Sequence, residues 1–112
     1  PDNRSAGQLL TDAKILIESA ADLTIQAMEY NSNERASGST VGPTKRVRFL
    51  LDALNKVDDA IGDTQKAASR ARLSNTPSGH GDYYLEQSAL SAYRRYSDFR
   101  KPLQAKFEEE LK

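Results

Sequence analysis

A repeated spacing of small and apolar residues constrains the fold of this chain more than any other feature. Between residues 5 and 30, such residues recur at alternating intervals of four and three. This spacing places them on one face of a helix, so the segment is expected to be a long amphipathic helix. The positions concerned are Leu9, Ala13, Leu16, Ala20, Leu23, Ala27 and Tyr30. Ser5 followed by Gln8 resembles a capping box, which favours a helix start at Ser5.

The same pattern predicts further helices at about 43–73 and 82–99. Their apolar faces run through Val47, Leu50, Leu54, Val57, Ile61, Ala68 and Ala71, and then through Leu85, Ala89, Ala92, Tyr96 and Phe99. Residues 31–42 and 74–81 lack periodicity and are rich in Ser, Asn and Gly, which indicates connecting loops. Gly62 lies inside the second helix, where it costs about 1 kcal/mol relative to Ala, and it suggests a bend or a close helix contact.

Pro102 predicts a break near the end of the chain. Proline removes a backbone donor and disfavours helical geometry at Lys101, so the helix should stop or kink at residues 98–101. A short fourth helix over 102–112 then begins at Pro102 and is either packed or a mobile arm. The expected fold is an all-α, single-domain, up-and-down four-helix bundle over residues 1–112. Three continuous long helices are the alternative.

The composition excludes several classes of protein. The 16 basic and 16 acidic residues give no net charge, so no bulk field attracts nucleic acid or an anionic membrane. The absence of cysteine excludes disulfides and thiolate sites. No apolar run approaches the roughly 20 residues of a membrane span, so direct membrane insertion is not expected. The chain begins with Pro1 rather than Met, which we interpret as a processed or trimmed start.

The sequence carries no recognisable catalytic or metal motif, so we expect neither an enzyme nor a cofactor. Its one histidine, His80, lies between two glycines in an expected loop. Helical bundles that hold two metal ions need Glu-x-x-His pairs, which are missing here. The neighbouring carboxylates of Asp58 and Asp59, and of residues 108–110, point about 100° apart on a helix and do not form an acid–base pair.

Charge is distributed unevenly, with about −4 over residues 1–34 and about +3 over residues 43–72. This asymmetry either pairs the first two helices with each other or presents cations to a partner. Lys45, Arg46 and Arg48 stand at the start of a helix, where cations oppose the macrodipole, and this favours the partner.

The stretch "YRRYSDFRKPLQAKF", residues 93–107, mixes aromatic rings with cations. Helical spacing places Tyr96, Phe99, Leu103 and Phe107 in the core. Arg94, Arg95, Arg100 and Lys101 then point outward. Arginine beside tyrosine is common in protein interfaces and in single-strand nucleic-acid grooves, and the neutral charge favours a protein partner over nucleic acid.

Three segments, "QLLTDAKILIESAADL", "RVRFLLDALNKVDDAIG" and "YRRYSDFRKPLQAKFEEELK", resemble the small helical extrinsic proteins of photosystem II. These are the PsbQ-like bundles, and the likeness is closest to the extra extrinsic protein of diatom-type oxygen-evolving complexes. The resemblance implies a non-catalytic subunit, peripheral on the thylakoid membrane in the plastid lumen. Such a subunit docks on intrinsic and other extrinsic photosystem II proteins, shields the manganese cluster, and helps to retain calcium and chloride.

We expect this subunit to be monomeric when free. Its docking contacts are expected at the basic residues Lys45, Arg46, Arg48, Arg94, Arg95, Arg100 and Lys101. The alternative is a generic helical adaptor that binds a partner helix in a groove beside the break at Pro102. A helical enzyme would need buried charges that converge on one cavity, and the sequence shows no such set.

Overall fold

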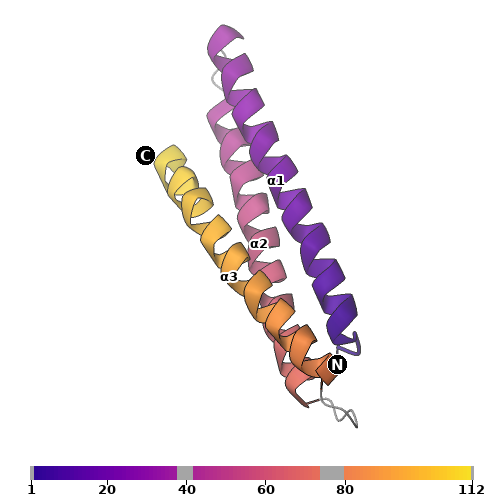
Figure 1. Ribbon diagram of the computed structural model, residues 1–112. Helices are drawn as coiled ribbons and strands as arrows, with labels where there is room; N and C mark the ends of the chain where they lie inside the picture. Colours follow the sequence, from indigo (N-terminus) through magenta and orange to yellow (C-terminus); the bar gives the residue numbers. More distant parts are fainter. Residues whose placement is uncertain (1, 38–41, 74–79, 112) are drawn as a thin grey trace.

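The computed structural model describes residues 2–37, 42–73 and 80–111, which form three long α-helices (Figure 1). These are α1 (Ala6–Ser37), α2 (Gly42–Leu73) and α3 (His80–Leu111), each of 32 residues. At a rise of about 1.5 Å per residue, each helix is about 48 Å long. The described residues include no strand.

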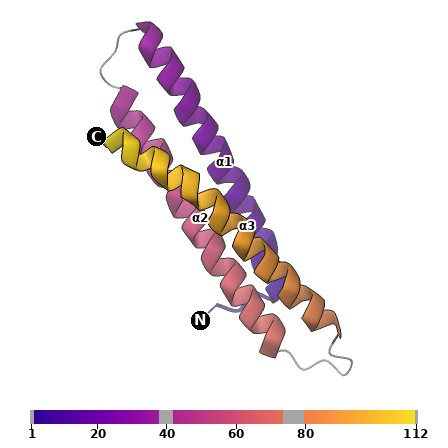
Figure 2. The same cartoon turned by 60° about the vertical axis from the view of Figure 1, so that its left-hand side comes forward.

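The helix α2 is central to the arrangement, because α1 and α3 both pack along it and barely touch each other. Figure 1 shows α1 and α3 on either side of α2, and both views show the end of α3 diverging from α1 (Figures 1 and 2). The molecule measures 64 × 22 × 19 Å, with a radius of gyration of 17.6 Å. A compact domain of this length has a radius of gyration of about 13 Å, so the protein is a rod rather than a globule.

The start of α1 is fixed by Ser5, as the sequence predicted. The Ser5 Oγ accepts a hydrogen bond from the backbone N–H of Gln8 at 3.1 Å, which satisfies a free donor of the first turn. The Gln8 side chain donates to Asp12 at 2.7 Å instead of reaching back to Ser5.

The predicted ends of the helices differ from the observed ones. The helix α1 continues to Ser37, seven residues beyond its predicted end, and α3 begins at His80 within the expected second loop. Extension of a helix that has already formed costs little, and Glu34, Arg35 and Ala36 are good helix formers, which accounts for the longer helix. The remaining loop residues, 38–41 and 74–79, lie outside the described residues.

The predicted four-helix bundle with a break near Pro102 is wrong, because α3 passes through Pro102 without interruption. Pro102 is exposed, so the backbone carbonyl of Asp98, which lacks its usual amide partner, is on the hydrated side of the helix. The next residue, Leu103, is buried, and Phe99 and Phe107 pack against the same cluster. Side-chain packing on both sides of the proline thus holds the helix together.

The core consists of two clusters along the rod. The larger is shared by all three helices and includes Ala20 and Ala27 from α1, Leu50 and Val57 from α2, and Leu103 from α3. The smaller lies toward the start of α1 and is built largely from alanines of α2 and α3 against Leu9. Small side chains let the helix axes approach closely, so a thin rod still buries its apolar faces.

Gly62 does not serve the close helix contact that the sequence suggested. A Cβ atom added there meets nothing within 4 Å apart from atoms of its own helix backbone and chain neighbours. The residue faces a shallow hollow that it shares with Arg4, Leu16 and Lys66. Packing therefore does not require glycine at this position.

Candidate docking surface

The structure divides the seven basic residues predicted to dock into paired and unpaired groups. Arg46, at the start of α2, is only 13% exposed and donates through Nε to Glu110 of α3 at 3.2 Å. Arg46 and Glu110 are 64 positions apart in the sequence. The Arg46 side chain is more buried than the exposed side chains of Lys45 and Arg48. Arg46 therefore fastens α3 to α2 and is not available to a partner.

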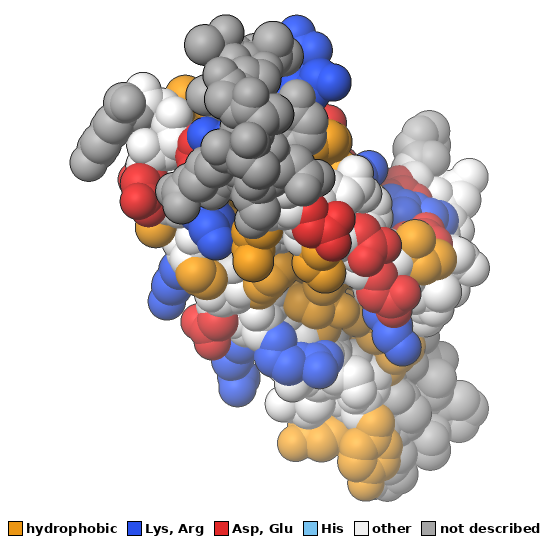
Figure 3. Space-filling model, turned by 90° about the horizontal axis from the view of Figure 1, so that it is seen from above, with side chains coloured by type: hydrophobic (Ala, Val, Ile, Leu, Met, Phe, Trp, Pro, Cys, Tyr) orange, Lys and Arg blue, Asp and Glu red, His pale blue; other side chains and the backbone are white. Residues whose placement is uncertain are grey.

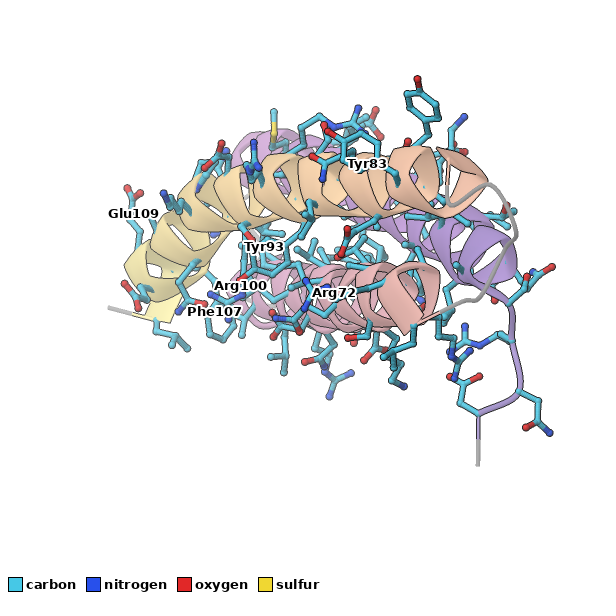
Figure 4. The ribbon with its side chains drawn as sticks, turned by 60° about the horizontal axis from the view of Figure 1, so that its bottom comes forward. Arg72, Tyr83, Tyr93, Arg100, Phe107 and Glu109 are labelled. Carbon is cyan, nitrogen blue, oxygen red and sulfur yellow. The ribbon has the colours of Figure 1, made fainter. Side chains whose placement is uncertain are left out.

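Arg100 is also used within the fold. Its Nε donates to Asp58 of α2 at 2.5 Å, and Nη2 lies 3.5 Å from the second carboxylate oxygen. The hydrogen bond to Asp58 raises the pKa of Arg100. Figure 4 shows Arg100, Tyr93 and Arg72 between the ribbons of α2 and α3. Glu109 points away from both helices. Arg72 donates to Glu86 of α3 at 2.7 Å, which adds a third link between these helices.

The remaining predicted cations of α3 are exposed. Lys101 lies 3.5 Å from Asp98, one turn away, but the two side chains are 79% and 74% exposed, so this pair is weak. Arg94 and Arg95 form no ion pair with any described residue. The guanidinium carbon of Arg95 lies 6.0 Å from the centroid of the Tyr96 ring, at the limit of a cation–π contact.

The predicted residues do not form one site. Glu110, the partner of Arg46, is 16 positions from Arg94 in α3, which is about 24 Å along the helix. The basic residues at the start of α2 are therefore far from Arg94 and Arg95. Of the seven, Arg48, Arg94 and Arg95 are exposed and have no ion pair with the described part of the chain.

An ion network that the sequence did not predict lies beside the start of α1. Arg4 donates to Asp12 of α1 at 2.8 Å and to both carboxylate oxygens of Asp63 of α2, at 3.1 and 3.3 Å. It also donates hydrogen bonds to both carboxylate oxygens of Asp2, at 2.7 and 3.0 Å. One guanidinium thus links the N-terminal segment to two helices. We call the network formed by Asp2, Arg4, Asp12, Asp63, Lys66 and Arg70 the N-terminal clasp.

Two basic residues of α2 complete the N-terminal clasp. The Nη2 atom of Arg70 donates to the backbone carbonyl of Asp2 at 2.5 Å, and Lys66 lies 3.4 Å from the Asp2 carboxylate. The Nη1 atom of Arg70 is buried, has no hydrogen-bond partner among the described residues, and lies 3.8 Å from Asp2. Asp63 is 93% buried and has Arg4 as its partner, so this carboxylate does not lie unpaired in the core.

The N-terminal clasp shifts the ionisation of its members. Hydrogen bonds from Arg4 hold the pKa of Asp2 far below its ordinary value and lower the pKa of Asp12 as well. The carboxylates of Asp2, Asp12 and Asp63 in turn raise the pKa of Arg4. The uneven charge of the first two helices was the only sequence signal of this network. It favoured contacts such as those of Asp2 with Lys66 and Arg70, but the Arg4–Asp63 bridge has the opposite sense, with the cation in the acidic region and the anion on α2.

Two surface hollows lie beside α2. One of about 270 Å³ lies between α2 and α3 and is lined by Thr64, Gln65, Ala68, Ser69, Arg72, Leu90 and Tyr93. Its only charged member, Arg72, is bound to Glu86. The other, of about 420 Å³, is lined by Arg4, Leu16, Asp58, Asp59, Gly62, Asp63 and Lys66. Its carboxylates at 58 and 63 are held by Arg100 and Arg4.

No group of three or more His, Asp or Glu side chains within residues 2–37, 42–73 and 80–111 is arranged to hold a metal ion. None of the described helices combines the length and apolar character that a membrane span requires. Figure 3 shows one end of the rod, where hydrophobic side chains lie between acidic and basic ones.

Comparison of the chain with protein-family models, with curated proteins and with solved structures gives no match.

Proposed function

We propose that this chain is a non-catalytic docking subunit that binds a protein partner through exposed cations. The observation that carries the proposal is the state of Arg94 and Arg95, which are exposed on α3 without a carboxylate partner among the described residues. Arg46 and Arg100, by contrast, are held by Glu110 and Asp58. Cations without an internal partner are available to acidic groups of another protein.

The identity of the partner is inferred from the resemblance of three segments to PsbQ-like proteins. The first segment falls in α1 and the second in α2, and the third follows α3 as far as its end at Leu111. We therefore propose that the partner is the lumenal side of photosystem II, and that the chain stabilises the manganese cluster and the retention of calcium and chloride. The lumenal location, the photosystem II partners and the monomeric free state belong to this proposal and rest on the resemblance.

The test is sedimentation of the protein with salt-washed photosystem II membranes from a diatom-type source. Binding should weaken steeply above about 0.1 M salt, because exposed ion pairs are screened over about 10 Å at that concentration. Oxygen evolution should be restored only in the fractions that bind. Absence of binding at low salt would contradict the assignment to photosystem II.

Charge-reversal variants locate the docking surface. The double variant Arg94→Glu with Arg95→Glu should lose at least tenfold in affinity for the membranes. The triple variant Asn55→Asp, Lys56→Glu and Gln65→Glu, on α2, changes the net charge by the same amount and should bind within twofold of the wild type. Equal loss in both variants would show that net charge, rather than these two arginines, determines binding.

The second candidate, a generic adaptor that binds a partner helix, is favoured by exposed apolar side chains on α1. Ile25 is 52% exposed and Met28 is 49% exposed, one turn apart on the same side of the helix. For an adaptor, Ile25→Ser alone should weaken binding in a lysate pull-down while Arg94→Glu with Arg95→Glu leaves it unchanged, and Met28 is left intact. The docking subunit predicts the reverse result.

A further inference from the structure

The line along which α1 and α3 approach each other carries a distinctive set of side chains. Leu10 and Leu85 pack against the smaller core cluster, and Ile17 and Phe99 pack against the larger one. Leu16 of α1 lines a hollow beside α2, and Leu90 and Tyr93 of α3 line another, so these flanks point away from the α1–α3 line. Helical spacing puts the four half-buried residues on the opposite flanks, where α1 and α3 face each other. Residues one or two helical turns away from them lie on the same sides.

Helical spacing adds exposed cations to this line. Lys14 lies between Leu10 and Ile17 on α1, while Arg95 and Lys106 lie one turn before and two turns after Phe99 on α3. All three cations are exposed, and none forms an ion pair with any residue that the structure describes. We call these cations, together with Ile17, Met28 and Phe99, the α1–α3 boundary.

No carboxylate interrupts the α1–α3 boundary, although the chain contains 16 acidic residues. On α1 the positions in register are 10, 14, 17, 21, 24 and 28, which read Leu, Lys, Ile, Ala, Thr and Met. On α3 they are 85, 88, 92, 95, 99, 102 and 106, which read Leu, Ser, Ala, Arg, Phe, Pro and Lys. The stretch of α3 thus carries two cations among mainly apolar side chains, and α1 adds one more, Lys14.

We propose that the α1–α3 boundary receives an acidic amphipathic helix of the partner protein. Because α1 and α3 both pack on α2 but barely touch each other, a further helix laid along the boundary contacts both of them. Its apolar face packs on Ile17, Met28 and Phe99, and its carboxylates reach Lys14, Arg95 and Lys106. This inference rests on the proposed docking function and names the shape and charge of the partner.

The chemistry of the boundary favours a helix over a nucleic acid or a flat anionic surface. Arg95 and Lys106 are 11 positions apart, about 17 Å along α3, with Phe99 between them. Cations this far apart, separated by half-buried apolar side chains, match the repeating apolar and charged positions of an amphipathic helix. A polyanion would instead require a denser run of cations.

The test uses a fluorescent helical peptide of about 20 residues, long enough to span the boundary, with leucine on one face and glutamate beside it. Fluorescence anisotropy should show that this peptide binds and that the same peptide with lysine in place of glutamate does not. Arg95→Glu with Lys106→Glu should weaken binding at least tenfold. The matched control, Asn55→Asp with Lys56→Glu and Gln65→Glu, changes the net charge equally and should stay within twofold. Failure of the acidic peptide to bind, or equal binding by both variants, would overturn the inference.

A second measurement locates the peptide on the protein. The chain has no cysteine, so a single cysteine can carry an environment-sensitive dye. Binding should shift the emission of a dye at Ala21→Cys, which is in register with the boundary. A dye at Gln26→Cys, on the other flank of α1, should not respond. A response at Gln26→Cys alone would place the peptide elsewhere and reject the boundary.

The two proposals fail separately. Peptide binding without membrane binding supports the boundary and removes photosystem II as the partner. Membrane binding that is unaffected by Arg95→Glu with Lys106→Glu supports the docking function and rejects the boundary as its surface.

Discussion

Arg46 and Glu110 form a hydrogen-bonded ion pair that fastens the last turn of α3 to the start of α2, with Nε 3.2 Å from Oε2. The two side chains are only 13% and 24% exposed. Removal of either partner leaves the other charge in a partly desolvated place. The pair also offsets the unfavourable position of a cation in the first turns of a helix.

A double-mutant cycle on Arg46→Ala and Glu110→Ala should give a coupling energy of about 1 kcal/mol, because the pair is largely shielded from water. The exposed pair Lys101 and Asp98 is the control and should give about 0.3 kcal/mol. Urea unfolding of the four variants of each cycle provides the values. Equal coupling in both cycles would contradict the importance of burial for the Arg46 contact.

Replacement of Pro102 by alanine should stabilise the protein by about 1–3 kcal/mol, because alanine restores the amide donor to the backbone carbonyl of Asp98. The gain is reduced by the greater freedom of the unfolded chain once proline is lost. Thermal unfolding checks the effect, with Lys106→Ala on the same helix as a variant expected to change little. A loss of stability in Pro102→Ala would show that the proline conformation is required.

Gly62→Ala should stabilise the protein by about 1 kcal/mol, because the new methyl group enters open space and alanine is the better helix former. Gly7→Ala serves as the comparison. Gly7 lies in the first turn of α1, where the helical preference of a residue matters less, so its gain should be smaller. Destabilisation by Gly62→Ala would reveal a contact that the hollow does not show.

Adjacent leucines on α2 should respond very differently to truncation. Leu50 is 1% exposed and Leu51 is 43% exposed. Leu50→Ala should cost about 2–5 kcal/mol in the free energy of unfolding because it opens a cavity in the core. Leu51→Ala should cost well under about 1 kcal/mol. Similar losses at both positions would show that the face of α2 that packs on the core is wrongly assigned.

Acid should release the N-terminal clasp. Since folding lowers the pKa of Asp2 and Asp12, their stabilisation is complete above their unfolded pKa of about 3.9 and is lost as the pH falls below it. Arg4→Met should therefore be less stable than the wild type at about pH 7, and the difference should shrink at about pH 3.

Urea midpoints across this pH range test the release, with Lys106→Met as a control whose difference from the wild type stays constant. A gap between wild type and Arg4→Met that does not change with pH would remove the electrostatic role of Arg4.

The buried faces of the helices followed from the sequence, because heptad spacing reports directly which side of a helix is apolar. Leu9, Leu50, Leu54 and Val57 were predicted on apolar faces and are buried, and Leu103 was predicted in the core and is buried. Pro102 was misread because the local rule for proline was applied without knowing that Leu103 and Phe107 would hold the helix by packing with the core cluster. Packing between helices overrode local preference there.

The ionic contacts could not be read from sequence in the same way. Helical spacing correctly placed Arg94 outward, but it gave Arg100 the same role, because it does not reveal which neighbouring helix supplies Asp58. The N-terminal clasp joins an extended segment to α1 and α2, so it depends on the tertiary arrangement of three separate pieces of chain. Charge counts indicated attraction between these regions without identifying the residues.

The central position of α2 also bears on how the chain folds. Nearly all contacts between helices join sequence neighbours, α1 with α2 and α2 with α3. The protein is therefore two helical hairpins that share one helix, and its relative contact order is low. Such topologies fold quickly because little loop entropy is lost before native contacts form. Either hairpin can form first. The third helix then packs on the α2 that is already folded, as a repeat packs on its neighbour in a linear repeat protein.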